Sequence, residues 1–340
     1  MLTCAALLLV GFMVANKSFC YSLLLFVLLM LSPLAVQADM LALSWDNDIT
    51  FSTDGNYTNG MKLTWHSDEQ LPLARQITQA LRFLPGWGNG GEYRSLAVNI
   101  EQLMMTPEDI SRPQPQYDDT PYAGLLQAEV WGIVRNTHYV TGYGIGTGVT
   151  GRASLAESGQ KLMHRWTGSE EPQGWDYQLP QKHTVAVSAM HARRWNAHRL
   201  GNLDAELGWG VGGQLGNWLT EVSTGLFYTF GRNLPGNIMP SYSVFSTPVS
   251  LAGLFSRHDS GWAVYMGLGT QFPLYSYLES EGRKAGYYTD AKDNLGIGFA
   301  GITMYAQGLL VSFSGQRTTS LTKQGDKPLF YGNFSLGWLY

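Results

Sequence analysis

The segment Leu203-Asp204-Ala205-Glu206-Leu207-Gly208-Trp209-Gly210-Val211-Gly212 carries an apolar side chain at every second position. Its odd-numbered residues share one face of an extended chain, and its even-numbered residues share the other. Alternation with a period of two predicts a β-strand. The even-numbered face holds two acidic residues and three glycines instead of the varied polar residues of a solvated sheet. This combination is typical of a transmembrane strand whose apolar face meets lipid and whose small or polar face lines a narrow lumen.

The same pattern recurs along the chain. Glycines 142, 144, 146 and 148 alternate with the larger residues of the segment 139–149, and the segments 96–101 and 262–269 also alternate. We expect the glycines to make room for large side chains of neighbouring strands inside a small barrel. The segment 330–340 carries aromatic residues on one face and ends in Tyr340. It resembles the signal that the bacterial barrel-assembly machinery reads.

The composition agrees with a membrane barrel. Charged residues make up 14% of the chain, against about 25% in an average soluble protein, while aromatics reach 13% and glycines number 40. The net charge of −4 argues against a nucleic-acid partner, because such a protein would carry a basic stripe. No apolar run of about 20 residues follows residue 38. The predicted fold class is all-β, a closed antiparallel transmembrane β-barrel of the outer-membrane type, with a soluble β-sandwich as the alternative.

Residues 1–38 have the features of an export leader. Two apolar runs, from Ala5 to Val14 and from Tyr21 to Leu31, precede a small-residue cleavage pattern at Val36-Gln37-Ala38. The first run is either part of a long leader or an extension from an upstream start codon. Both cysteines, Cys4 and Cys20, lie in this segment. The exported chain, residues 39–340, would then contain no disulfide and must be held by its backbone ladder and apolar contacts.

We expect about twelve strands and a monomer. The predicted strands are 39–47, 57–66, 93–103, 122–134, 137–150, 180–193, 200–213, 217–230, 245–258, 260–273, 296–315 and 327–340. The segment 71–84 has helical spacing and is predicted to lie against the membrane surface. With both chain ends in the periplasm, the connections 48–56, 104–121 and 151–179 would meet at the extracellular end of the barrel.

These three connections hold the residue types that could support chemistry. His164 could exchange a proton near neutral pH, with Glu170 fixing its tautomer; a solvated loop histidine is the alternative. The oxygen-rich stretch Asp46-Asn47-Asp48 suits Ca²⁺, although Asp and Asn also favour ordinary turns. Arg112 could bind a phosphate or an oxyanion, or could be a solvated surface charge. Phosphorylated lipopolysaccharide is the abundant anion at the outer surface.

Four motifs stand out along the chain. The first is Asn47-Asp48 with Tyr57-Thr58-Asn59-Gly60. The second is Thr106-Pro107-Glu108-Asp109-Ile110 followed by Asp119-Thr120-Pro121-Tyr122-Ala123-Gly124. The third is His164 with Gly168 and Glu170, and the fourth is Gly231-Arg232-Asn233-Leu234-Pro235. Together they resemble the motifs of the outer-membrane lipid A 3′-O-deacylases, the LpxR-like family, in which the third would be the catalytic histidine region.

The resemblance implies a twelve-stranded barrel that hydrolyses the 3′-linked acyl esters of lipid A in the outer leaflet with Ca²⁺. His164 would be the general base, and Glu170 would support it. Asn47 and Asp48 would hold the metal, with Thr58 lining the site. Arg112 stands where the family has a lysine, and Thr120 where it often has a basic residue. Two alternatives remain at this point, an esterase acting on phospholipids and a non-enzymatic pore or scaffold.

Overall fold

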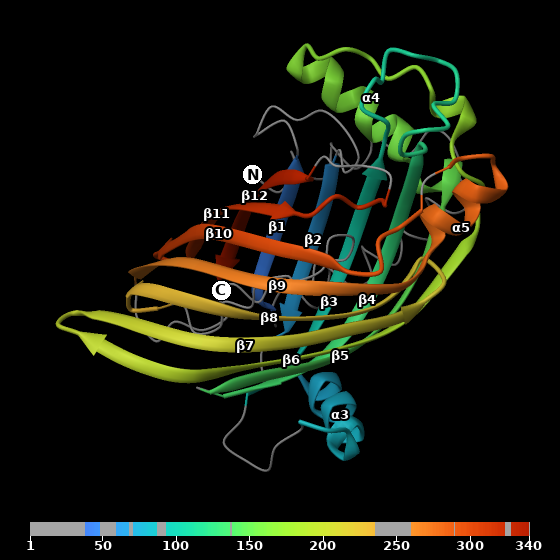
Figure 1. Ribbon diagram of the computed structural model, residues 1–340. Coiled ribbons are helices and arrows are strands. Elements are labelled where there is room, and N and C mark those ends of the chain that lie inside the picture. Colours follow the sequence, from blue (N-terminus) through green and yellow to red (C-terminus); the bar gives the residue numbers. More distant parts are fainter. Residues whose placement is uncertain are drawn as a thin grey trace.

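A closed barrel of twelve antiparallel strands forms the body of the protein (Figure 1). The computed structural model describes residues 38–47, 59–67, 71–86, 93–136, 138–234, 260–288, 290–323 and 328–339. The first eight strands are β1 (Ala38–Asn47), β2 (Asn59–Ser67), β3 (Tyr93–Met105), β4 (Ala123–Arg135), β5 (Tyr139–Thr150), β6 (His183–Leu200), β7 (Leu203–Gly216) and β8 (Leu219–Arg232). The last four are β9 (Ser260–Ser276), β10 (Leu295–Ala306), β11 (Leu309–Thr318) and β12 (Phe330–Leu339).

Each strand pairs with its neighbours in sequence, and β1 closes the barrel against β12. The predicted fold class is therefore confirmed. Of the predicted leader, only Ala38 belongs to the residues that the structure describes, and it begins β1.

The division of the C-terminal third into strands was partly wrong in the sequence prediction. The predicted single strand 296–315 is in fact the hairpin of β10 and β11. The turn lies at Gln307 and Gly308, whose φ angles are 51° and 79°, as a two-residue hairpin turn requires. The predicted strand 260–273 is confirmed as β9, and β9 pairs directly with β8. The predicted strand 245–258 falls outside the described residues.

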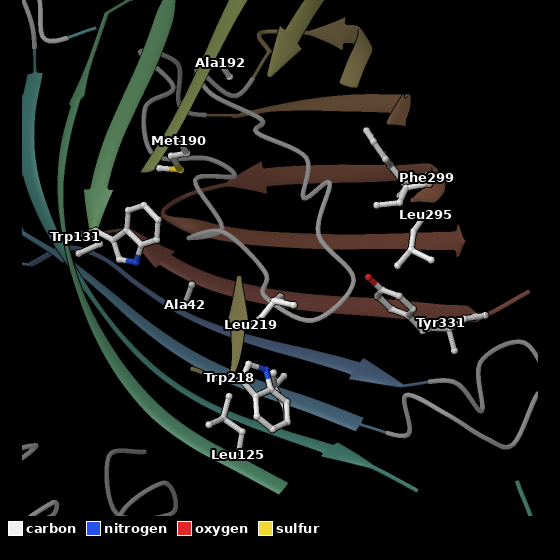
Figure 2. Packing of buried hydrophobic residues seen from close by; sticks show 14 of the residues in the cluster. Ala42, Leu125, Trp131, Met190, Ala192, Trp218, Leu219, Leu295, Phe299 and Tyr331 are labelled. Carbon is white, nitrogen blue, oxygen red and sulfur yellow. The ribbon is translucent and has the colours of Figure 1, made fainter. Parts of the chain in front are cut away.

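Large side chains lie in the barrel interior. Trp131 points inward from β4, and Phe299 and Tyr331 point inward from the opposite wall (Figure 2). A Cβ atom on Gly144 would lie 2.6 Å from the Trp131 ring, and one on Gly267 would lie 2.2 Å from Phe299. The glycines of the alternating segments therefore make room for neighbouring rings, as predicted. On the outer face, Ile145 is 65% exposed and Leu268 is 73% exposed, as lipid-facing residues should be.

Several charged residues that face the barrel interior are held by polar partners. Lys62 Nζ lies 3.3 Å from Glu101 Oε1, and both side chains are nearly inaccessible. Gln127 Nε2 donates to Glu101 over 2.8 Å, and Asn99 Nδ2 donates to Glu129 over 3.2 Å. Buried charges need such partners, because burial removes their hydration.

The two ends of the barrel differ in the length of their connections. One end carries the segments 106–122, 151–182 and 277–294, with the helices α4 (Ala156–Thr167) and α5 (Tyr277–Lys284), and we refer to it as the α4 end (Figure 1). The 3-10 turns η4 (Gly151–Ser154) and η5 (Trp175–Tyr177) also belong there. The predicted convergence of the second and third connections is confirmed.

The opposite end, the α3 end, has the short turns 136–138, 201–202 and 307–308 and two longer connections, 68–92 and 233–259. The first of these holds the helix α3 (Pro72–Ala80) and the 3-10 turn η3 (Leu81–Phe83). The helix predicted within 71–84 is thus confirmed. Short turns face the periplasm in outer-membrane barrels, so we infer that the α4 end is extracellular. None of the helices in the described part of the chain is long and apolar enough to cross a bilayer.

Candidate functional site at the α4 end

The segment that carries His164 is a helix, whereas the sequence was interpreted as a loop. α4 ends at Gly168, whose φ of 74° lies in the left-handed region. The amide of Ser169 donates to the His164 carbonyl over 3.0 Å, and the Gly168 amide donates to the same oxygen. Glycine suits this position because it adopts a positive φ without steric strain. The turn reverses the chain direction and brings the backbone of Glu170 next to the His164 side chain.

One face of α4 packs on the rest of the protein. Ala156, Gln160 and His164 are all buried and are spaced by four residues, which places them on the same side of the helix. Gly124 of β4 makes room for the start of α4, because a Cβ atom there would lie 2.4 Å from Ala156 Cβ. Leu125 and Trp131 point into the barrel (Figure 2), so Gly124 is on the outer face of β4. The start of α4 therefore packs on the outer face of β4 at the end of the barrel, and the helix continues beyond the strands (Figure 1).

Further contacts hold α4 in place, and the sequence prediction had missed them. Trp175 Nε1 donates a 2.7 Å hydrogen bond to the buried Oε1 of Gln160. The rings of Tyr122 and Trp175 lie 5.0 Å apart in an edge contact. Gln102 of β3 donates to the Ser154 carbonyl over 2.7 Å. The four-residue spacing of Ala156, Gln160 and His164 was the available sequence signal for this packing.

His164 is only 7% exposed, and its orientation is fixed by the main chain. Its Nδ1 is hydrogen-bonded to the backbone carbonyl of Glu170. Because a carbonyl can only accept, Nδ1 carries the proton in this contact. Nε2 then has the lone pair that a general base requires. Glu170 thus contributes its carbonyl to this contact, rather than the expected carboxylate, and the residue is exposed.

The oxygen-rich stretch after Trp45 is partly strand. Asp46 and Asn47 are the last two residues of β1, in agreement with the predicted strand 39–47. The buried Asp46 carboxylate accepts a hydrogen bond from Asn333 of β12, which gives it a role in closing the barrel. Asn47 pairs with Asn59 and Gly332 in the backbone register. Asp48 and Thr58 lie outside the described residues.

The described residues do not by themselves form a metal centre. No group of three or more His, Cys, Asp or Glu side chains in this part of the chain is arranged to hold a metal ion. The predicted calcium ligands Asn47 and Asp48 stay a prediction, because Asp48 lies outside the described residues.

Side chains of the motif in residues 106–124 stabilise the connection between β3 and β4 through hydrogen bonds. Asp119 accepts from the amide of Glu108 over 2.8 Å and from the amide of Thr120 over 2.6 Å. Asp109 accepts from the Ser111 hydroxyl, and this contact, with the nearby Arg112, holds the pKa of Asp109 below its ordinary value. These bonds explain why acidic residues occupy both halves of the motif.

Arg112 is exposed and lies beside an open pocket. Its Nε is 2.7 Å from Asp109 Oδ2. The pocket has a volume of about 470 Å³ and is lined by Arg112, Tyr117, Tyr288 and neighbouring residues of the 106–122 connection. His164 does not line it. The structure thus places Arg112 at the same end of the barrel as His164, but in a separate pocket.

The Gly231–Pro235 landmark has a structural role at the α3 end. Asn233 has a φ of 50°, and its side chain donates to the Ser260 carbonyl over 2.9 Å. Tyr305 donates to the Asn233 carbonyl over 2.6 Å. Pro235 lies beyond the residues described.

Together, the closed barrel, its apolar outer wall and the docked helix at one end define an outer-membrane β-barrel with a candidate site beside the bilayer. Residues 19–340 match the family model described as "Outer membrane protein LpxR", and the chain belongs to this family. The resemblance in the motifs is thereby confirmed, as is location in the outer membrane.

The fold agrees with that of a solved structure. The chain is similar to LpxR from Salmonella typhimurium, with 16% identity and a TM-score of 0.72 over 88% of this chain and 100% of that one. The β-domain of the Bordetella autotransporter BrkA is more distant, with 11% identity and a TM-score of 0.45 over 89% of this chain and 99% of that one. No curated protein matches the chain.

Proposed function

We propose that this protein is a lipid A 3′-O-deacylase that removes 3′-linked acyl chains from lipopolysaccharide in the outer membrane. Membership of the LpxR family supports the substrate class. The observation that carries the proposal is His164, buried on α4 with Nδ1 bound to the Glu170 carbonyl. A histidine held in this tautomer, on a helix that starts against the outer face of β4, suits the ester of a membrane lipid.

The proposed reaction is the hydrolysis of a carboxylic ester. Nε2 of His164 takes a proton from a water molecule while the water oxygen attacks the ester carbonyl carbon. The bond from that carbon to the 3′ oxygen then breaks, and the imidazolium returns the proton to the departing alkoxide. The products are a free fatty acid and a sugar hydroxyl, and the histidine is regenerated.

A calcium ion at Asn47 and Asp48 would supply positive charge to the ester carbonyl oxygen. Both residues offer the oxygen donors that hard cations prefer. Thr58 would line the same region. Arg112 would bind an anionic group of the substrate from its pocket, because a guanidinium matches phosphate geometry in two hydrogen bonds.

Mass spectrometry of lipid A from cells that express the protein tests the proposal. We expect the loss of the 3′-linked acyl or acyloxyacyl unit, and no loss when Ca²⁺ is chelated. Replacing His164 with alanine should lower the rate by about 10²–10⁴-fold, while the barrel remains folded and heat-modifiable on a gel. Wild-type activity in the variant would overturn the role of His164.

The same experiment separates the alternatives. Unchanged lipid A together with hydrolysed phospholipid would show a phospholipid esterase. Unchanged lipids together with steady conductance in a planar bilayer would show a pore. Full activity after chelation would refute the calcium requirement but not the hydrolysis of lipid A.

A further inference from the structure

A segment at the α3 end runs along the outside of the barrel. This outer belt consists of residues 71–86 and includes α3 and η3. Leu71 and Ala74 are buried against Trp65 of β2 and Leu96 of β3, with Ile77 packed beside them. Lys62 and Glu101 face the interior, so Trp65 and Leu96 belong to the opposite, outer faces of their strands. The belt therefore covers part of the surface that would otherwise face lipid.

The end of the belt is attached to the outer face of β5. Tyr143 donates a 2.5 Å hydrogen bond to the Pro85 carbonyl, and Thr141 Oγ1 donates to the Gly86 carbonyl over 3.0 Å. Both residues share the outward face of β5 with the exposed Ile145. Polar groups cannot remain unpaired in hydrocarbon without a large free-energy cost. The belt supplies their partners, so this height of the wall is compatible with the bilayer.

The exposed residues of the belt are both apolar and basic. Leu73 is 50% exposed, Phe83 is 80% exposed, and Leu84 is also exposed. Arg75 and Arg82 are exposed on the same segment, which contains no acidic residue. The Arg82 guanidinium lies 4.6 Å from the centre of the Phe83 ring. An exposed phenylalanine beside an arginine matches the boundary between acyl chains and headgroups, where both side chains find suitable surroundings.

We propose that the outer belt is a binding surface for anionic phospholipids of the periplasmic leaflet. Leu73, Phe83 and Leu84 enter the acyl-chain region, and the two arginines bind headgroup phosphates. Positive charge attracts an anionic leaflet, and a guanidinium binds phosphate through paired hydrogen bonds. This surface lies at the opposite end of the barrel from His164, so the proposal does not depend on the enzymatic one.

Site-specific fluorescence in lipid nanodiscs tests the depth of the belt. The full chain with Cys4→Ser and Cys20→Ser carries a single new cysteine, either Phe83→Cys or the control Asn202→Cys in the β6–β7 turn. Each is labelled with an environment-sensitive dye in phosphatidylcholine nanodiscs whose acyl chains are brominated or plain. We expect bromination to quench most of the emission at position 83 and little at position 202. Equal emission at position 83 in both lipids would overturn the proposal.

The headgroup contact is tested with the same label. Replacing a third of the lipid with phosphatidylglycerol should shift the emission at position 83 to shorter wavelength. The shift should be lost in Arg75→Gln/Arg82→Gln and retained in Arg152→Gln, where an exposed arginine at the α4 end is removed. A shift that persists without both belt arginines would refute the anionic partner. Heat-modifiable mobility on a gel shows that each variant has folded.

Discussion

At the scale of single residues, Gly168 decides how His164 is held. Its positive φ ends α4 and turns the chain so that the Glu170 carbonyl reaches Nδ1 of His164. A Cβ atom at this position would meet nothing within 4 Å. The effect of alanine at Gly168 would therefore come from backbone strain alone, which is about 1–2 kcal/mol for a left-handed residue.

We predict that Gly168→Ala lowers deacylation by up to about thirtyfold, since a strain of about 1–2 kcal/mol disfavours the turn that holds His164, and 1.36 kcal/mol corresponds to tenfold. Gly201→Ala is a matched control, because Gly201 has a φ of 66° and equally open surroundings at the other end of the barrel. Both variants should lose similar stability in urea unfolding, but only Gly168→Ala should lose activity in a lipid A assay. Equal losses of activity would show that the turn has no specific role.

Residue types in the sequence made His164 the candidate base, but they did not predict which atom of Glu170 would contact it. A carboxylate at position 170 suggested a side-chain partner, whereas the contact uses the main-chain carbonyl, which every residue type possesses. The partner of Asp46 was likewise not predictable from residue types. Its carboxylate resembled a metal ligand next to Asn47, yet it bonds to Asn333, which lies 287 residues away in the sequence.

At the scale of elements, the position of α4 depends on a close approach to β4. A Cβ atom at Gly124 would lie 2.2 Å from Ser154 Oγ and 2.4 Å from Ala156 Cβ. We predict that Gly124→Ala displaces the start of α4 and lowers activity by at least about tenfold, because misplacement of a catalytic group by an ångström can cost a hundredfold.

The control for Gly124→Ala is Gly282→Ala in α5, where the nearest heavy atom to a new Cβ is 3.7 Å away. It should retain wild-type activity. Lipid A hydrolysis and barrel heat-modifiability should be measured for both. Full activity in Gly124→Ala would mean that the packing of α4 tolerates the added methyl group without moving His164.

α5 is predicted to be sensitive to acid. The Glu281 carboxylate lies 2.7 Å from both Lys182 Nζ and Lys284 Nζ. Hydrogen bonds from these two lysines hold the pKa of Glu281 below its ordinary value. A carboxyl with a lowered pKa stabilises the folded state above its unfolded pKa of about 4.3 and loses this effect as the pH falls through its folded pKa.

Hydrogen exchange in the segment 277–284 should therefore accelerate as the pH falls below about 4, after correction for the intrinsic pH dependence of exchange. Glu281→Gln should remove this additional acceleration, since glutamine does not titrate. An identical acceleration in wild type and variant would assign it to another group.

At the scale of the whole molecule, period-two alternation predicted the barrel because the lipid outside and the crowded interior select different residues at alternate positions. The strand count was right, but the division into strands was not. Ala306 to Leu309 continues an apolar pattern, and the two-residue turn at Gln307 and Gly308 interrupts it too briefly to show in periodicity. Helix α4 was missed for a related reason, since its buried face uses glutamine and histidine rather than large apolar residues.

The buried ion pair of Lys62 and Glu101 is expected to stabilise the barrel from the inside. The two residues face each other in the register of β2 and β3, and each side chain is almost completely inaccessible. Removal of one partner leaves the other charge buried with less compensation, which typically costs about 3–5 kcal/mol. We predict a loss of this size for Lys62→Met, measured by urea unfolding in lipid vesicles.

The double variant Lys62→Met/Glu101→Gln should recover much of that loss, because it removes the second charge and lets the amide at 101 still accept from Gln127, whose present bond is 2.8 Å long. Replacing an entire buried pair is often close to neutral. If the double variant were less stable than Lys62→Met, the ion pair would not be the interaction that Lys62 provides. The lysine would then stabilise the wall through the packing of its aliphatic stem.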